Sequence, residues 1–107
     1  MDNDVELMRE LLLQLEDYQT SPRSVVVISA ELEAESLERD SDEVEACLAV
    51  LHDFAYIDGP GPDAPGFFLF RKLTQKGARF VRESRDPRAW EKMKRHYAQL
   101  RREAEPD

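Results

Sequence analysis

The sequence predicts an α+β domain that combines several helices with a small β-sheet of two or three strands and ends in a long C-terminal helix. Apolar residues recur at helical spacing in separate segments, most of them preceded by a residue that caps helices. A glycine- and proline-rich tip at residues 58–66 separates two short apolar segments and predicts a β-hairpin. Helix, strand, tip, strand and helix follow one another in the order of a winged helix, which presents one helix and one hairpin to a partner, most often DNA.

The composition predicts one cytoplasmic domain over residues 1–107. The chain has no apolar run of membrane-spanning length, and its first residues lack the pattern of a secretory signal. The single cysteine, Cys47, lies on an apolar helix face, which suits a reducing compartment. Because no Cys/His group has zinc-ligand spacing, we expect no zinc site. We also expect no cofactor, no other metal and no contact with a membrane.

The first helix is predicted over residues 3–17, where apolar residues follow helical spacing from Val5 to Leu15. Residues 25–28 are strongly β-forming, and apolar and polar residues alternate after them. We therefore predict one strand from about residue 24 to 33. The competing interpretation is a strand to residue 28 followed by a short helix over 29–39.

The second long helix is predicted over residues 41–54, capped by Asp40 or Ser41. Its buried stripe consists of four residues: Val44, Cys47, Leu48 and Leu51. The hairpin starts at Tyr56 and is closed by residues 67–72. Since proline and glycine weaken strand pairing, we expect the tip between these segments to hold no β-ladder.

Two more helices are predicted after the hairpin. Thr74 caps the first, over residues 74–84, and the pair Asp86-Pro87 starts the second, over residues 86–104. The apolar residues of the last helix are spaced like a heptad seam and consist of Trp90, Met93, Tyr97, Leu100 and Ala104. This narrow seam packs either on the body of the domain or on a second copy, and we expect a homodimer.

The charge of the chain is divided unevenly between its halves. Residues 1–58 contain 16 Asp/Glu and 3 Lys/Arg, whereas residues 59–107 contain 7 Asp/Glu and 12 Lys/Arg. The basic half could meet a polyanion, or the two halves could meet across a subunit contact. The remaining interpretation is that both halves are solvated surfaces.

Five segments together resemble a bacterial and prophage family of winged-helix-like proteins, domain-of-unknown-function family 2513. They are DVELMRELL at 4–12, SDEV at 41–44, LHDFAYI at 51–57, L-T-x-x-G-x-x-F at 73–80 and WEKxK at 90–94. The resemblance covers most of the chain and implies a winged-helix-like fold and a phage or mobile-element context. It implies no biochemical activity.

The chain departs from the family pattern in two places. Cys47 stands where the family usually has His or Tyr, and the acidic segment at 31–40 is longer.

An enzyme is not indicated, and we predict no catalytic residues. In the predicted strand Glu31, Glu33 and Glu35 would share one face, but no further ligands or pocket accompany them. His52 and His96 are far apart in sequence and lack a nucleophile or acid partner. No small-molecule site is predicted.

Binding of a macromolecule is the predicted function, with DNA and protein as alternative partners. The helix at 41–54 begins with Asp42, Glu43 and Glu45 and offers no Arg, Asn or Gln to read bases. A regulator-like role in transcription would therefore involve weak, non-specific phosphate contacts. Their candidates are Arg71, Lys72, Lys76 and Arg79 near the hairpin, and Arg82, Arg85, Arg88, Lys92 and Arg95 beyond it.

The alternative is a protein-binding module, for example a phage-encoded inhibitor of a host or defence protein. A dense acidic surface could contact a basic partner or occupy a cleft that normally binds nucleic acid. Its candidate residues are Glu31, Glu33, Glu35, Asp42, Glu43 and Glu45.

Overall fold

The computed structural model describes residues 4–19 and 24–104, with the side chains of residues 5–19 and 24–96. The elements are α1 (Asp4–Tyr18), β1 (Val26–Ser29), α2 (Ala30–Leu37), α3 (Ser41–Asp53), β2 (Ile57–Asp58), β3 (Gly61–Pro62), β4 (Phe67–Phe70), β5 (Lys72–Leu73), α4 (Gln75–Ser84) and α5 (Pro87–Ala104). One antiparallel sheet has the order β1-β4-β3, and β2 pairs with β5. The predicted α+β class is confirmed.

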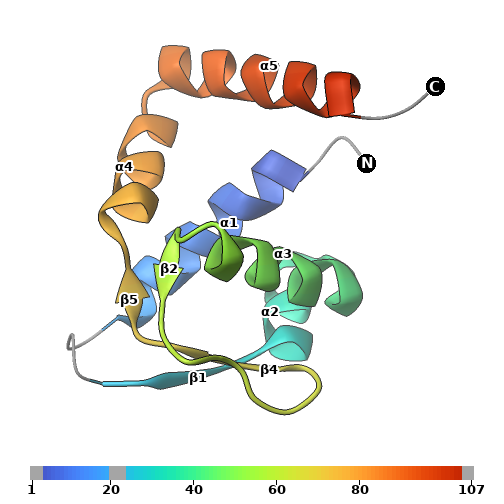
Figure 1. Cartoon of the computed structure of the whole chain (residues 1–107), viewed down its shortest axis with the longest axis vertical. Coiled ribbons are helices and arrows are strands. Elements are labelled where there is room, and N and C mark those ends of the chain that lie inside the picture. The colour runs from blue at the N-terminus through green and yellow to red at the C-terminus, as the bar shows by residue number, and fades with distance from the viewer. Residues whose placement is uncertain (1–3, 20–23, 105–107) are drawn as a thin grey trace.

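Helix α1 lies at the centre of the hydrophobic core. The side chains of Leu11, Leu12 and Leu15 are fully buried, because α1 packs against α3 on one side and α4 on another. The larger sheet closes one end of the molecule, and α5 lies across the other end (Figure 1). The sheet contributes Ile28 and Phe70 to the same core.

The strand predicted for residues 24–33 is wrong in its second half. β1 ends at Ser29, and α2 begins at Ala30. The Ser29 side chain accepts a hydrogen bond from the Leu32 amide at 3.3 Å and caps the helix. Leu32 is 66% exposed, whereas Glu33 is buried. The competing strand-then-helix interpretation is therefore correct, and the alternating pattern misleads because Leu32 does not belong to the core.

The expectation that the tip holds no ladder is also wrong. Gly61 pairs with Leu69, and Pro62 pairs with Phe68. The Asp63 amide donates to the Phe67 carbonyl at 3.2 Å, so hydrogen-bonded and non-bonded pairs alternate from there. By this alternation Pro62 stands at a non-bonded pair, where its missing N–H costs the sheet no bond.

The L-T-x-x-G-x-x-F segment at residues 73–80 holds the start of α4 against the turn that follows α3. The Thr74 hydroxyl oxygen accepts a hydrogen bond from the Gly77 amide at 3.1 Å and donates one to the Ala55 carbonyl at 2.6 Å. Gly77 lies directly against the Tyr56 carbonyl, where a Cβ atom would clash. Phe80 is buried and meets the Tyr56 ring edge-on at 5.7 Å.

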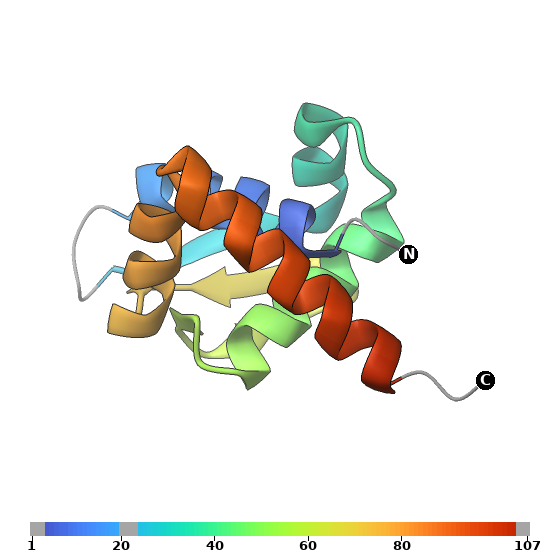
Figure 2. The same cartoon turned by 90° about the horizontal axis from the view of Figure 1, so that it is seen from above.

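Helix α5 docks on the rest of the chain through its first turns. Trp90 is half-buried and meets Phe80 edge-on, with ring centroids 6.4 Å apart. The guanidinium of Arg9 lies 5.1 Å from the Trp90 ring. The far end of α5 extends past the other elements (Figure 2). In the part of the chain that the structure describes, no helix is long and apolar enough to cross a membrane.

Candidate functional site

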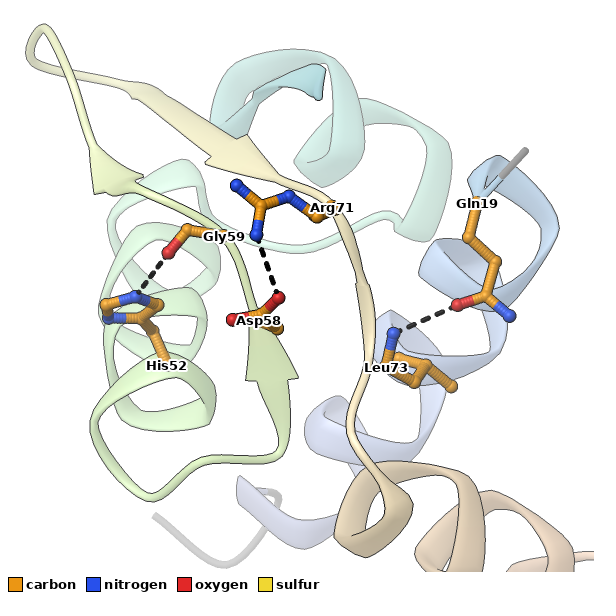
Figure 3. A network of polar contacts seen from close by, with 6 residues as sticks. All are labelled: Gln19, His52, Asp58, Gly59, Arg71 and Leu73. Carbon is orange, nitrogen blue, oxygen red and sulfur yellow. Dashed lines mark hydrogen bonds and ion pairs between the residues drawn. The ribbon is translucent and has the colours of Figure 1, made fainter. Parts of the chain in front are cut away.

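The hairpin formed by residues 57–73, hereafter the wing, is tied to α3 by His52. The Nε2 atom of His52 lies 3.0 Å from the Gly59 carbonyl oxygen (Figure 3). The imidazole also meets the Phe68 ring edge-on at 5.5 Å. Gly61 passes so close that a Cβ atom there would lie 3.0 Å from the imidazole. His52 thus lies in the last turn of α3, half-buried beneath the wing.

Two further contacts fix the base of the wing. Arg71 donates to the Asp58 carboxylate at 3.2 Å, and the Arg71 amide donates to the Asp58 carbonyl at 2.8 Å. Across the other side of β5, the Gln19 side chain accepts a hydrogen bond from the Leu73 amide at 2.9 Å (Figure 3). These bonds hold the wing in a fixed position relative to α1 and α3.

A pocket of about 310 Å³ lies between α3 and the wing. Glu45, Leu48 and Ala49 form its α3 wall, because positions i, i+3 and i+4 share one helix face. Residues 62–68 of the wing form the opposite wall, and Ala30 at the start of α2 closes one end.

The pocket is apolar except for two carboxylates. Glu45 reaches it from α3 and Asp63 from the wing, and no Lys or Arg lines it. Phe67, which also belongs to the lining, is 46% exposed. Among the described residues, no group of three or more His, Cys, Asp or Glu side chains could hold a metal ion.

The exposed surface of α3 combines acidic and apolar side chains. Asp42 and Glu43 lie in the first turn, where the helix dipole stabilises carboxylates. Towards the other end, Val50 and Phe54 are 41% and 61% exposed. Residues 43, 50 and 54 follow helical spacing along one stripe.

The six acidic residues predicted as one surface do not all belong to it. Glu33 is buried and accepts a hydrogen bond from Gln14 Nε2 at 2.9 Å, which joins α2 to α1. Burial raises the pKa of Tyr18, and a hydrogen bond to Glu33 and its negative charge raise it further. Five acidic residues of the set remain exposed and are called the α2–α3 acids: Glu31, Glu35, Asp42, Glu43 and Glu45.

The four basic residues predicted near the wing have different roles. Arg71 is held by Asp58. Lys76 donates to the Phe54 carbonyl at 2.8 Å, and its ammonium lies 4.4 Å from the centre of the Tyr56 ring. Both side chains therefore support the fold. Lys72 and Arg79 are exposed.

Exposed basic side chains also continue along α4 and α5. Phe80, Val81 and Ser84 are buried, so Arg79 and Arg82 lie on the outward face of α4. On α5 the corresponding exposed residues are Arg88, Lys92 and Arg95. All five belong to the candidates predicted for phosphate contacts, whereas the further candidate Arg85 forms an ion pair with Glu16 at 2.6 Å.

The predicted dimer seam is divided by the structure. Trp90 and Met93 pack against the core of their own chain. The side chains of Tyr97 and Leu100 lie outside the described part of α5.

The pocket and the role of His52 were missed from the sequence. The sequence did contain a signal for this contact. Glu45, Ala49 and His52 recur at helical spacing and therefore share one face of α3, which is the face that meets the wing. Cys47 is buried in the core, as its stripe predicts.

Comparison with known proteins places the chain in one family. No curated protein and no solved structure matches it. Residues 2–102 match the model of the family described as "Hypothetical protein (DUF2513)". This match covers nearly the whole chain and agrees with the resemblance carried by the five sequence segments. The protein therefore belongs to the DUF2513 family.

Proposed function

We propose that this protein is a non-catalytic winged-helix domain that binds another protein through α3 and the wing. The winged-helix assignment is supported by the element order and by the sheet order β1-β4-β3. One observation carries the function. The pocket between α3 and the wing is lined by apolar side chains and two carboxylates, with no basic residue.

The surface of α3 fits a protein better than it fits DNA. A helix that enters the major groove needs donors for base edges and tolerates few carboxylates near phosphates. Here its first turn carries Asp42 and Glu43, while Val50 and Phe54 offer apolar contact area. Acidic charge speeds association with a basic partner, and apolar contacts then hold the complex.

The proposed setting is the bacterial cytoplasm, with a phage or prophage origin. The single cysteine of the sequence, Cys47, is buried, which suits a reducing compartment. The partner would be a host or defence protein with a basic surface, and the domain would act as its inhibitor or regulator.

Capture from a lysate of the bacterium that carries the gene tests this function. The first variant neutralises α3 by Asp42→Asn, Glu43→Gln and Glu45→Gln, and a matched variant neutralises Lys72, Arg79 and Arg82 by Gln. Glu33 stays unchanged because it is buried. We expect a protein partner that is retained by wild type and by the matched variant and lost from the α3 variant. Equal recovery by both variants would contradict the proposal.

A second candidate function is association with DNA through the basic surface of α4 and α5. It is favoured by the exposed side chains of Arg79 and Arg82 on α4 and of Arg88, Lys92 and Arg95 on α5. Such contacts reach phosphates and give salt-sensitive binding with little sequence preference.

We expect any DNA affinity to disappear in the double variant Lys72→Glu/Arg79→Glu, because both side chains are exposed and neither supports the fold. The control Glu43→Gln should leave the affinity unchanged or raise it. Fluorescence anisotropy with a labelled duplex at several salt concentrations is the measurement. Tight, sequence-specific binding that requires Asp42 or Glu43 would show that the description of α3 is wrong.

We also propose a homodimer through the far half of α5. Its support is the heptad spacing that continues beyond Trp90 and Met93 to Tyr97 and Leu100.

A further inference from the structure

We propose that the pocket between α3 and the wing binds one arginine or lysine side chain from a peptide segment of the partner protein. This inference depends on the proposed protein-binding function and specifies what the pocket recognises. The pocket volume of about 310 Å³ is at the lower end for ligand sites. It therefore suits a single long side chain.

The charges of the pocket select a cation. Glu45 and Asp63 reach the pocket from opposite walls, and neither has a basic neighbour in the lining. Both side chains are exposed, so a bound cation would meet carboxylates that already point to solvent. An anionic ligand such as a phosphate would be repelled by both.

The apolar walls select a cation that has a hydrocarbon stem. Leu48 and Ala49 line the α3 side, and Phe68 lines the wing side. Arg and Lys bury an aliphatic stem while their charged group stays near water. A bare metal ion or ammonium ion would leave these walls uncovered.

Arginine should bind more tightly than lysine. The planar guanidinium can donate two hydrogen bonds to one carboxylate, whereas the ammonium of lysine acts as a point charge. The Glu45 carboxylate lies beside the wing, because a Cβ atom built on Gly66 would be in van der Waals contact with Glu45 Oε2 at 4.0 Å. A guanidinium held by this carboxylate would therefore lie at the wing side of the pocket.

The test uses fluorescent nonapeptides with a central arginine between leucine and glycine residues, and matched peptides with lysine or citrulline at the centre. Citrulline keeps the shape of arginine but removes its charge. Anisotropy titrations of the full chain should rank arginine above lysine and place citrulline at least about tenfold weaker. Equal binding of arginine and citrulline, or no binding of either basic peptide at about 1 mM, would overturn the inference.

Two pairs of variants locate the binding site. Ala49→Phe fills the pocket, whereas Ala46→Phe places the same side chain on an exposed α3 position outside its lining. Glu45→Gln removes a pocket charge, whereas Glu83→Gln removes an exposed charge on α4, outside the pocket and the proposed binding face. We expect the first variant of each pair to bind the arginine peptide at least about tenfold more weakly than wild type. The second variant of each pair should bind it with the affinity of wild type. Thermal unfolding should verify that all four variants fold.

The two proposals fail in different ways. If the captured partner still needs Asp42, Glu43 and Glu45 but binds Ala49→Phe like wild type, the pocket inference is overturned and the protein-binding function stands. If capture does not depend on these three acidic residues at all, the proposed function itself is overturned.

Discussion

Replacing Gly77 by alanine should destabilise the fold by about 3 kcal/mol or more, because the new Cβ atom would collide with the Tyr56 carbonyl. This backbone atom cannot move aside freely. The Tyr56 carbonyl accepts a hydrogen bond from the Thr74 amide at 3.1 Å, and moving α4 away would also strain the Thr74 bond to Ala55. In thermal unfolding, the midpoint should fall by more than about 10 °C.

The direction of the stability change distinguishes a clash with Tyr56 from an effect of helix propensity. Helix propensity alone predicts that Gly77→Ala stabilises the chain by about 1 kcal/mol, since glycine is a poor helix former. The matched control is Ala78→Gly, at the next and exposed position of α4, which should cost about 1 kcal/mol. An unchanged or raised midpoint for Gly77→Ala would show that α4 does not approach Tyr56 as described.

Replacing Trp90 by alanine should destabilise the chain by about 2 kcal/mol by loosening α5 from the body. The ring packs on Phe80, and the cationic groups of Arg9 and Lys94 lie 5.1 and 5.7 Å from its centroid. Circular dichroism during thermal unfolding should show a lower midpoint. Trp90→Phe should retain part of the stability, because an aromatic ring still meets Phe80.

The proposed dimer can be separated from this packing effect. Light scattering of wild type should give about twice the chain mass of 12.4 kDa. Leu100→Asp should reduce this mass towards that of one chain without lowering the unfolding midpoint to the extent of Trp90→Ala. A clean monomer of the wild-type chain at high micromolar concentration would contradict the dimer.

Segments whose signals come from neighbouring residues were predicted well. Thr74 caps α4, and Asp86-Pro87 precedes α5, as local capping chemistry requires. The stripe from Val44 to Leu51 is buried as its helical spacing predicts. In these segments sequence neighbours are also spatial neighbours, so the pattern alone contains enough information.

The errors concern residues whose environment is set by distant parts of the chain. Glu33 is buried because Gln14 of α1 supplies a hydrogen bond, and no pattern within residues 24–39 reveals this partner. Pro62 fits into a strand because the register places it at a non-bonded pair with Phe68. Register is a property of the folded hairpin, so the composition of the tip could not predict it.

Only the acidic charge of the candidate site was predicted from the sequence, and its pocket was not. The acidic character of α2 and α3 is evident from the sequence, but the pocket exists because His52 and Phe68 hold the wing beside α3. The basic residues give a similar lesson. Arg71 and Lys76 resemble Lys72 and Arg79 in sequence, yet ion pairing and a backbone contact turn the first two into structural residues.

The most direct test of the proposed binding face is site-specific photo-crosslinking in the cells that contain the partner. Benzoylphenylalanine would replace Phe54, which is 61% exposed at the C-cap of α3, and in a parallel experiment Arg82, which is exposed on α4. We predict that the probe at position 54 crosslinks to a protein and the probe at position 82 does not. Crosslinks to protein or DNA from position 82 alone would contradict a binding face formed by α3 and the wing.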